Sequence, residues 1–289
     1  MASWRLIDGF NMAFRAFYAV PDLVRSGDKF PTGALHGWVR TLWKLEDTLG
    51  KGNTVVFFDL GGSARHRELL PEYKAQRGSM PDELRAQIPL LKELSRLMGY
   101  AVVQQEGVEA DDLIGSAALR LSQKGETVAI VSSDKDFGQL VGGNISQVCP
   151  PPTANPKLGW RTLDAEKVKE KFGVGPERIV DYLALVGDAS DNIKGIEGVG
   201  PKTAAKWLNE FGSASGLLEK WNWVKPDRFR IILNHSRELI ERNLQLVPLK
   251  TDCDIPDTML TAPAVDKSAL KNFLESYELK ANAREVDIR

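Results

Sequence analysis

The sequence predicts an α/β domain with a mostly parallel central sheet, followed by a helical domain. Short apolar runs rich in β-branched residues are typical of buried strands, and the first half contains four of them: Trp4–Ile7, Val55–Phe58, Ala101–Gln104 and Val128–Val131. Helical patterns separate these runs, and one of them repeats apolar residues from Leu113 to Leu121 at helical spacing. Strands that alternate with helices predict a parallel sheet covered by helices on both faces.

The elements after the second and fourth runs follow from proline and capping signals. The segment from Tyr73 to Met98 is long for a simple crossover, and Pro81 should lie in the first turn of a helix there, which Pro89 should kink or split. The proline-rich segment after Cys149 should be a loop or the tip of a hairpin, and the α/β part should end soon after it. We therefore expect domains at residues 1–163 and 164–289. In the second domain, Asp164 should cap one helix and Pro176 should open another.

Composition excludes several classes of protein. The chain has 289 residues, 43% of them hydrophobic, which suits one or two globular domains with a real core. No run approaches the roughly 18 apolar residues of a membrane span, and the first residues lack the pattern of an export signal. Cys149 and Cys253 are far apart in the chain and should be reduced thiols. These features predict a cytoplasmic protein without membrane contact.

Acidic residues follow the predicted strands at the point where each strand ends. Asp8, Asp59 and Asp134 come after the first, second and fourth runs, and the carboxyl ends of parallel strands meet at one edge of a sheet. Asp134 and Asp136 are two residues apart, so in extended backbone their side chains should share a side. Each acid alone is more typical of a turn or a helix cap. Gathered on one rim, however, they would repel one another unless a cation neutralised them.

Nine acids are candidates for such a site. Asp8, Asp59, Asp134 and Asp136 are four of them, and two further groups supply the other five. Glu109, Asp111 and Asp112 form one group, and Asp188 and Asp191 form the other, on a tight turn of the helical half. Oxygen ligands without His or Cys favour Mg²⁺ or Mn²⁺, and two such ions about 3.5–4 Å apart can clamp the attacking and leaving oxygens of a phosphodiester. Without the nine acids the formal charge of −1 becomes +8, so the remaining surface would attract phosphate.

Two further segments indicate contact with a nucleic-acid backbone. The run Gly195–Lys206 contains Gly198 and Gly200 just before Pro201 and Lys202, and a helix that begins there could hold a phosphate on its free N–H groups. The alternative is a glycine-rich turn between two core helices. The run Tyr73–Arg77 combines an aromatic residue with Lys74 and Arg77. Its alternative is an ordinary solvated surface.

Taken together, these motifs resemble the 5′–3′ exonuclease domain of bacterial DNA polymerase I, within the flap-endonuclease superfamily. The matching segments run in family order over almost the whole chain: Leu6–Gly9, Phe58–Asp59, Pro71–Arg77, Gly107–Gly115, Ser133–Asp136 and Gly187–Ile193 with the glycine hairpin after it. One departure lies before the arch, where many relatives have Arg-His and this chain has Arg65, His66 and Arg67.

The resemblance implies a site, a substrate and cofactors. Asp8, Asp59, Glu109 and Asp111 would serve one metal ion, and a second would be served by Asp112, Asp134, Asp136, Asp188 and Asp191. Lys74 would reach the scissile phosphate from a helical arch at about residues 70–98, with Arg77 and Tyr73 beside it. Gly198, Gly200 and Lys202 would belong to a helix–three-turn–helix element that grips duplex DNA and carries K⁺.

The predicted activity is hydrolysis of 5′ flaps, nicks or recessed 5′ ends of DNA, or of an RNA primer on DNA, by a monomer that works beside a DNA polymerase and a ligase near the nucleoid. Two alternatives stay open. A structure-specific DNA-binding module that does not cleave would need the hairpin but few of the acids. A small-molecule phosphotransferase would need neither the hairpin nor the basic run. A labelled 5′ flap incubated with Mg²⁺ or with EDTA separates them.

Overall fold

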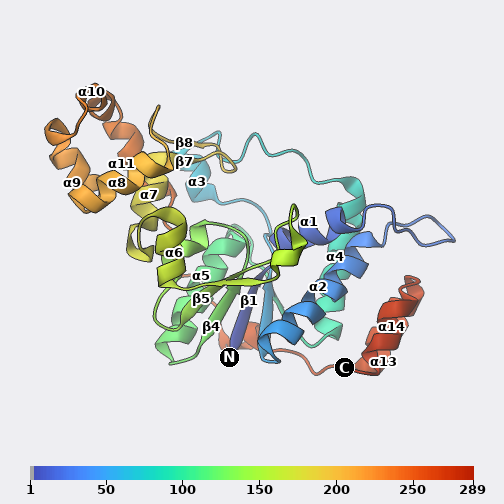
Figure 1. Ribbon diagram of the computed structural model, residues 1–289. Helices are drawn as coiled ribbons and strands as arrows, with labels where there is room; N and C mark the ends of the chain where they lie inside the picture. The colour runs from blue at the N-terminus through green and yellow to red at the C-terminus, as the bar shows by residue number, and fades with distance from the viewer. Residues whose placement is uncertain (1–2) are drawn as a thin grey trace.

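The computed structural model describes residues 3–289 as a central sheet with helices on both faces and a helical half above one edge (Figure 1). The elements of the α/β part are β1 (Trp4–Asp8), α1 (Gly9–Ala19), α2 (Gly33–Leu49), β2 (Asn53–Phe57), α3 (Ala64–Leu69), α4 (Asp82–Leu97), β3 (Ala101–Val103), α5 (Ala110–Gln123), β4 (Val128–Val131), η1 (Asp136–Leu140), β5 (Ile145–Cys149), η2 (Pro156–Leu158) and β6 (Arg161–Leu163).

The helical half and the C-terminal segment follow. Their elements are α6 (Ala165–Phe172), η3 (Pro176–Arg178), α7 (Ile179–Val186), β7 (Gly187–Asp188), β8 (Ile193–Lys194), α8 (Pro201–Phe211), α9 (Ala214–Glu219), η4 (Trp221–Trp223), α10 (Arg228–His235), α11 (Arg237–Leu246), α12 (Asp257–Leu260), α13 (Lys267–Ser276) and α14 (Lys280–Val286). The two last helices return to the α2 and α4 side of the sheet (Figure 1).

The sheet has the strand order β3-β2-β1-β4-β5-β6, and all neighbours are parallel except β5 and β6. The four predicted strands are confirmed to within a residue or two at their ends. The strands β5 and β6 were not themselves predicted, but they pair antiparallel on either side of the proline-rich segment, which confirms the hairpin-tip alternative. From β1 the chain adds β2 and β3 on one side and then β4 and β5 on the other, so the order of strand addition reverses between β1 and β4. Open α/β sheets bind their ligands at such a switch point.

Alternate residues of the strands enter two different cores, because successive side chains point to opposite faces. Ile7, Val56 and Val131 pack with α1, α2 and α4 on one face. Leu6, Val55 and Ile130 pack with α5 on the other face. Burial on both sides explains why these strands read as continuous apolar runs, and it fixes the carboxyl ends of β1, β2 and β4 at one rim.

The segment expected to form an arch has two distinct parts. Residues 71–77 form turns and a bend, residues 78–81 have no regular secondary structure, and together they connect α3 to α4 across the top of the molecule (Figure 1). α4 buries Leu84, Leu91 and Leu94 in the core that contains α2. Lys74 and Arg77 therefore lie on a turn and not on a helix. Pro81 is the N-cap of α4 rather than a residue of its first turn, and Pro89 does not split the helix.

The helical half matches its capping signals. The side chain of Asp164 accepts a hydrogen bond from the backbone of Lys167 and so caps α6, as predicted. Pro176 opens the short helix that leads into α7. Both cysteines are free thiols, as expected. Within residues 3–289, no helix is long and apolar enough to cross a membrane.

Candidate metal centre and nucleic-acid interface

Three of the predicted acids, Asp8, Asp59 and Asp134, lie at the carboxyl ends of neighbouring strands. Backbone N–H groups and a hydroxyl hold Asp8 and Asp59 in place. Asp8 ends β1 and caps α1, with Oδ1 3.0 Å from the backbone nitrogen of Asn11. Its Oδ2 accepts a hydrogen bond of 2.9 Å from the Ser132 hydroxyl. Asp59 accepts one of 2.6 Å from the backbone of Ala110, at the start of α5. The first turn of α5 is thereby tied to the end of β2.

The acids around the start of α5 face two directions. Burial raises the pKa of Asp111 well above its ordinary value, and the charges of Asp8 and Asp134 raise it further, which places this carboxylate on the rim with them. Asp112 accepts a hydrogen bond of 2.8 Å from the backbone of Lys250. Burial raises the pKa of Asp112. The charge of Glu109 also raises it, and His66 and Arg65 lower it. The structure therefore turns Asp112 toward α3 and the segment after α11, and away from Asp136.

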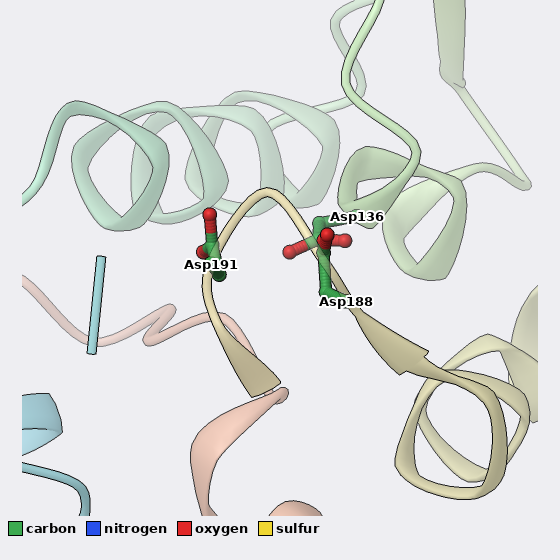
Figure 2. A group of neighbouring side chains, drawn as sticks. All are labelled: Asp136, Asp188 and Asp191. Atoms are coloured by element: carbon green, nitrogen blue, oxygen red, sulfur yellow. The ribbon is translucent and has the colours of Figure 1, made fainter. Parts of the chain in front are cut away.

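The carboxylates of Asp136, Asp188 and Asp191 gather most closely. One oxygen of each lies within 4.8 Å of the others, and Figure 2 shows Asp188 and Asp191 on the turn between β7 and β8, with Asp136 beside Asp188. Burial would raise the pKa of Asp188, but two partners hold it below its ordinary value. They are the Ser190 hydroxyl, 2.6 Å from the carboxylate, and the Lys135 ammonium, 3.3 Å from it. Residues from both halves of the chain thus form one acidic site.

Asp134 and Asp136 do not lie in extended backbone, so this prediction was wrong. Asp136 begins the short helix η1, and its backbone nitrogen donates to the Asp134 carboxylate at 3.0 Å. The Ser-Asp-Lys-Asp run therefore makes a tight turn, which still brings both acids to the rim. Glu109 is the N-cap of α5, and Asp111 lies in its first turn.

The electrostatics of the rim call for a cation. Burial raises the pKa of Asp8 to about 7, and the nearby charges of Asp134 and Asp59 also raise it. Burial followed by Asp134, Asp188 and Asp191 raises the pKa of Asp136 well above its ordinary value. The buried Oδ1 of Asp136 has no hydrogen-bond partner. An unpaired carboxylate oxygen among other acids fits a hard divalent cation, because the site offers oxygen ligands alone.

The basic arm, which we define as residues 73–77, is folded onto these acids. The ammonium of Lys74 lies 2.9 Å from Glu109 Oε1 and 3.8 Å from Asp191 Oδ2. Arg77 pairs with Asp191 at 2.5 Å. The Tyr73 hydroxyl donates to Asp191 at 2.8 Å. Lys74 and Tyr73 are half-buried, whereas Arg77 is exposed, so the alternative of a solvated surface segment fits only Arg77.

The hairpin residues are presented to solvent. Gly198, Gly200 and Lys202 are exposed, and Gly200 is the N-cap of α8. Gly198 has a φ of 72°, in the left-handed region that favours glycine. A Cβ built at Gly198 or Gly200 would meet no atom within 4 Å. Packing inside the protein therefore gives no reason for glycine at position 200, whereas close approach of an external backbone would.

Sequence reasoning missed three residues that support the acids. Ser132 and Lys135 hold Asp8 and Asp188; Ser132 lies two residues before Asp134 and Lys135 lies between Asp134 and Asp136, so their position in the motif was a usable signal. His66 is the third: its ring nitrogen Nδ1 lies 3.8 Å from Glu109. No local pattern pointed to it, because Glu109 lies 43 residues further along the chain and the two meet only through the fold.

The fold and the rim define a class: an α/β domain with an acidic, cation-binding site at the switch point of its sheet, joined to a helical half that contributes two of the acids. Comparison with known proteins narrows this class. The family model of the 5′–3′ exonuclease N-terminal resolvase-like domain matches residues 3–173, and that of the 5′–3′ exonuclease C-terminal SAM fold matches residues 174–268.

Relatives agree with the family models. A 5′–3′ exonuclease of Aquifex aeolicus is 38% identical over 99% of this chain and 96% of its own length. DNA polymerase I of Pseudomonas aeruginosa is 40% identical over 86% of this chain, but the match covers only 27% of the polymerase. A bacteriophage T5 flap endonuclease solved with DNA and metal ions has a TM-score of 0.68 and 27% identity, with 95% of this chain and 99% of that chain covered.

This chain belongs to the 5′–3′ exonuclease family, and it is a nuclease of the flap-endonuclease fold. It covers nearly the full length of the Aquifex protein and about a quarter of the length of the Pseudomonas polymerase. A T5 5′-exonuclease with bound zinc ions, 27% identical with a TM-score of 0.70, places divalent metal ions in a structure of the same fold.

Proposed function

We propose that the protein is a structure-specific 5′ nuclease that cleaves DNA at or near free 5′ ends, acting on flaps, nicks and recessed 5′ ends, and on RNA primers annealed to DNA. The observation that carries the proposal is the meeting of acids from β1, β4 and the β7–β8 turn at one rim, with the basic arm folded over them. A module that only bound DNA would not need these acids.

The residues of the rim fit two divalent cations, Mg²⁺ or Mn²⁺. Asp8, Asp59, Glu109 and Asp111 would hold one of them, and Asp134, Asp136, Asp188 and Asp191 the other. Asp112 stays in the proposal only as a residue that acts through Glu109 or water, since its carboxylate is turned to Lys250. When bound, the ions supply neutralising charge for the phosphate and lower the barrier to attack by water.

The chain's own residues do the rest. The acids would hold the cations, and through them the scissile phosphate, at the carboxyl ends of the strands. Lys74 lies close enough to the rim to place its ammonium beside a phosphate bound there, where it would stabilise charge that grows in the transition state. Arg77, which is more exposed than Lys74, would bind the DNA strand that enters the basic arm. Gly198, Gly200 and Lys202 would contact the duplex backbone, with K⁺ on the hairpin carbonyls.

A flap labelled at its 5′ end and, separately, at the 3′ end of the cleaved strand tests the proposal. Endonucleolytic cleavage releases the flap as one labelled oligonucleotide, whereas exonucleolytic cleavage releases labelled mononucleotides. Either product in Mg²⁺ and its absence in EDTA support the proposal; binding without cleavage in Mg²⁺ and Mn²⁺ contradicts it. In the cell we propose a monomer in the cytoplasm, beside the nucleoid, that works with a DNA polymerase and a ligase.

A further inference from the structure

His66 is a buried histidine that the nuclease proposal does not use. It lies on α3, is 5% exposed, and its backbone nitrogen is capped by the Ser63 hydroxyl. Its Nε2 lies 3.0 Å from the backbone oxygen of Leu246 at the end of α11. A carbonyl oxygen only accepts, so Nε2 carries the hydrogen in this contact.

The other ring nitrogen of His66 faces the acidic site. Nδ1 is buried and has no hydrogen-bond partner, and it lies 3.8 Å from Glu109 Oε2. A buried polar atom without a partner is uncommon in folded proteins and calls for an explanation. The hydrogen bond from Nε2 to Leu246 fixes the orientation of the ring, so Nδ1 faces Glu109 at a distance too long for a hydrogen bond, and the ring acts through its other face contacts.

His66 also fixes the residue that precedes Lys74. Its ring stacks on the ring of Tyr73, with centroids 4.5 Å apart and an interplanar angle of 13°. The Tyr73 hydroxyl has one hydrogen, which it donates to Asp191 at 2.8 Å rather than to Glu109 at 3.3 Å. The stacked pair therefore lies beside Glu109 Oε2, while Lys74 binds Oε1.

We infer that His66 is a positioning residue: its ring orients Tyr73, whose hydroxyl donates to Asp191, for the cation site, and it joins that site to α11 of the helical half. The inference rests on the proposed role of Asp191 as a metal ligand. His66 itself contacts neither metal nor DNA in this scheme. Groups that orient a metal ligand typically change metal affinity by about 10- to 100-fold when removed.

Two substitutions separate the contacts of this side chain. His66→Gln keeps an amide that can donate to Leu246 but loses the stacked ring. His66→Phe keeps a ring against Tyr73 but loses both nitrogens. The probe is Mn²⁺ alone, titrated into the DNA-free protein and followed by electron paramagnetic resonance. We then measure the Mg²⁺ concentration that gives half of the maximal single-turnover cleavage rate, well below the unfolding temperature of each variant.

Both variants should bind Mn²⁺ about 10-fold or more weakly, and the Mg²⁺ midpoint of cleavage should rise in parallel while saturating Mg²⁺ restores most of the rate. A purely structural role would lower the unfolding temperature and leave both metal midpoints unchanged, and that result would overturn the inference. Asp134→Ala is the reference: if it cleaves normally, the assignment of the rim acids as the cation site has failed. If it is inactive while both His66 variants bind Mn²⁺ like the parent, only the present inference has failed.

Discussion

Glycine 200 offers a clean test of the hairpin, because the structure separates its effect on folding from its effect on binding. Its backbone is extended, with φ −96° and ψ 179°, and an added Cβ would meet no atom within 4 Å. The folded protein therefore has room for Gly200→Val. The cost to folding comes from the weaker N-cap of α8 and should be about 1 kcal/mol, or about 2–4 °C in Tm.

The cost to duplex binding should be larger. If the backbone at position 200 meets a phosphate, a branched side chain blocks that approach and removes a hydrogen bond to a charged group, which is worth about 1.5–3 kcal/mol. This corresponds to about a 10- to 100-fold rise in Kd. The loss should be equal for duplexes of different sequence, since backbone contacts read no bases.

Gly195 is the matched control in the same hairpin. A Cβ there would lie 2.1 Å from the backbone oxygen of Val186 and 2.7 Å from the nitrogen of Gly187, so Gly195→Val must displace backbone. It should destabilise folding by about 3 kcal/mol or more. Fluorescence anisotropy with a labelled duplex in Ca²⁺, together with thermal unfolding, measures both effects. A Gly200→Val protein that folds and binds duplex like the parent refutes the phosphate contact.

Further predictions concern the arm and the rim. Lys74→Ala should lower the maximal single-turnover rate by about 10²–10³ with little change in flap affinity, because a donor at the reacting phosphate acts mainly in the transition state; lost affinity with an unchanged rate would leave Lys74 a binding residue only. Arg77→Ala should weaken flap binding more than it slows cleavage, and the opposite pattern in the same two assays would exchange the roles. Asp111→Asn should raise the Tm of the metal-free protein. Burial and then the charges of Asp8 and Asp134 raise the pKa of Asp111, so the Asp111 carboxyl binds a proton more tightly in the native state than in the unfolded state. The wild type therefore loses stability as pH rises above 3.8, the ordinary value of this pKa, and the gain in Tm should grow over that range; a gain that stays constant with pH would contradict this account.

Much of the fold could be predicted because its signals are local. The parallel strands are buried on both faces, so they are short continuous apolar runs, and Asp164 and Pro176 are capping signals that act within one turn. The strands β5 and β6 escaped because β6 is only three residues long and two of them are exposed. The turn at Asp134–Asp136 escaped because a spacing of two fits both a strand and a tight turn, and the hydrogen bond from Asp136 to Asp134 selects the turn.

The part of the site that could be predicted is the part formed by the carboxyl ends of the parallel strands. The rim position of Asp8, Asp59 and Asp134 follows from the parallel sheet alone. What sequence could not give is how the helical half meets the sheet. The β7–β8 turn places Asp188 beside Asp136, and the Leu246 carbonyl fixes His66, through contacts between residues far apart in the chain. The direction of Asp112 depends in the same way on Lys250, which lies 138 residues further along.

The central claim is that acids from both halves form one cation site that cleaves DNA, and Asp134→Ala tests it most directly. Asp134 lies among Asp8, Asp111, Asp136 and Asp188, and the charges of these groups affect one another. The measurement is cleavage of a labelled 5′ flap in Mg²⁺, beside binding of the same flap in Ca²⁺. The account predicts that the variant binds the flap with nearly the parent affinity and does not cleave it. Undiminished cleavage by Asp134→Ala would contradict the account.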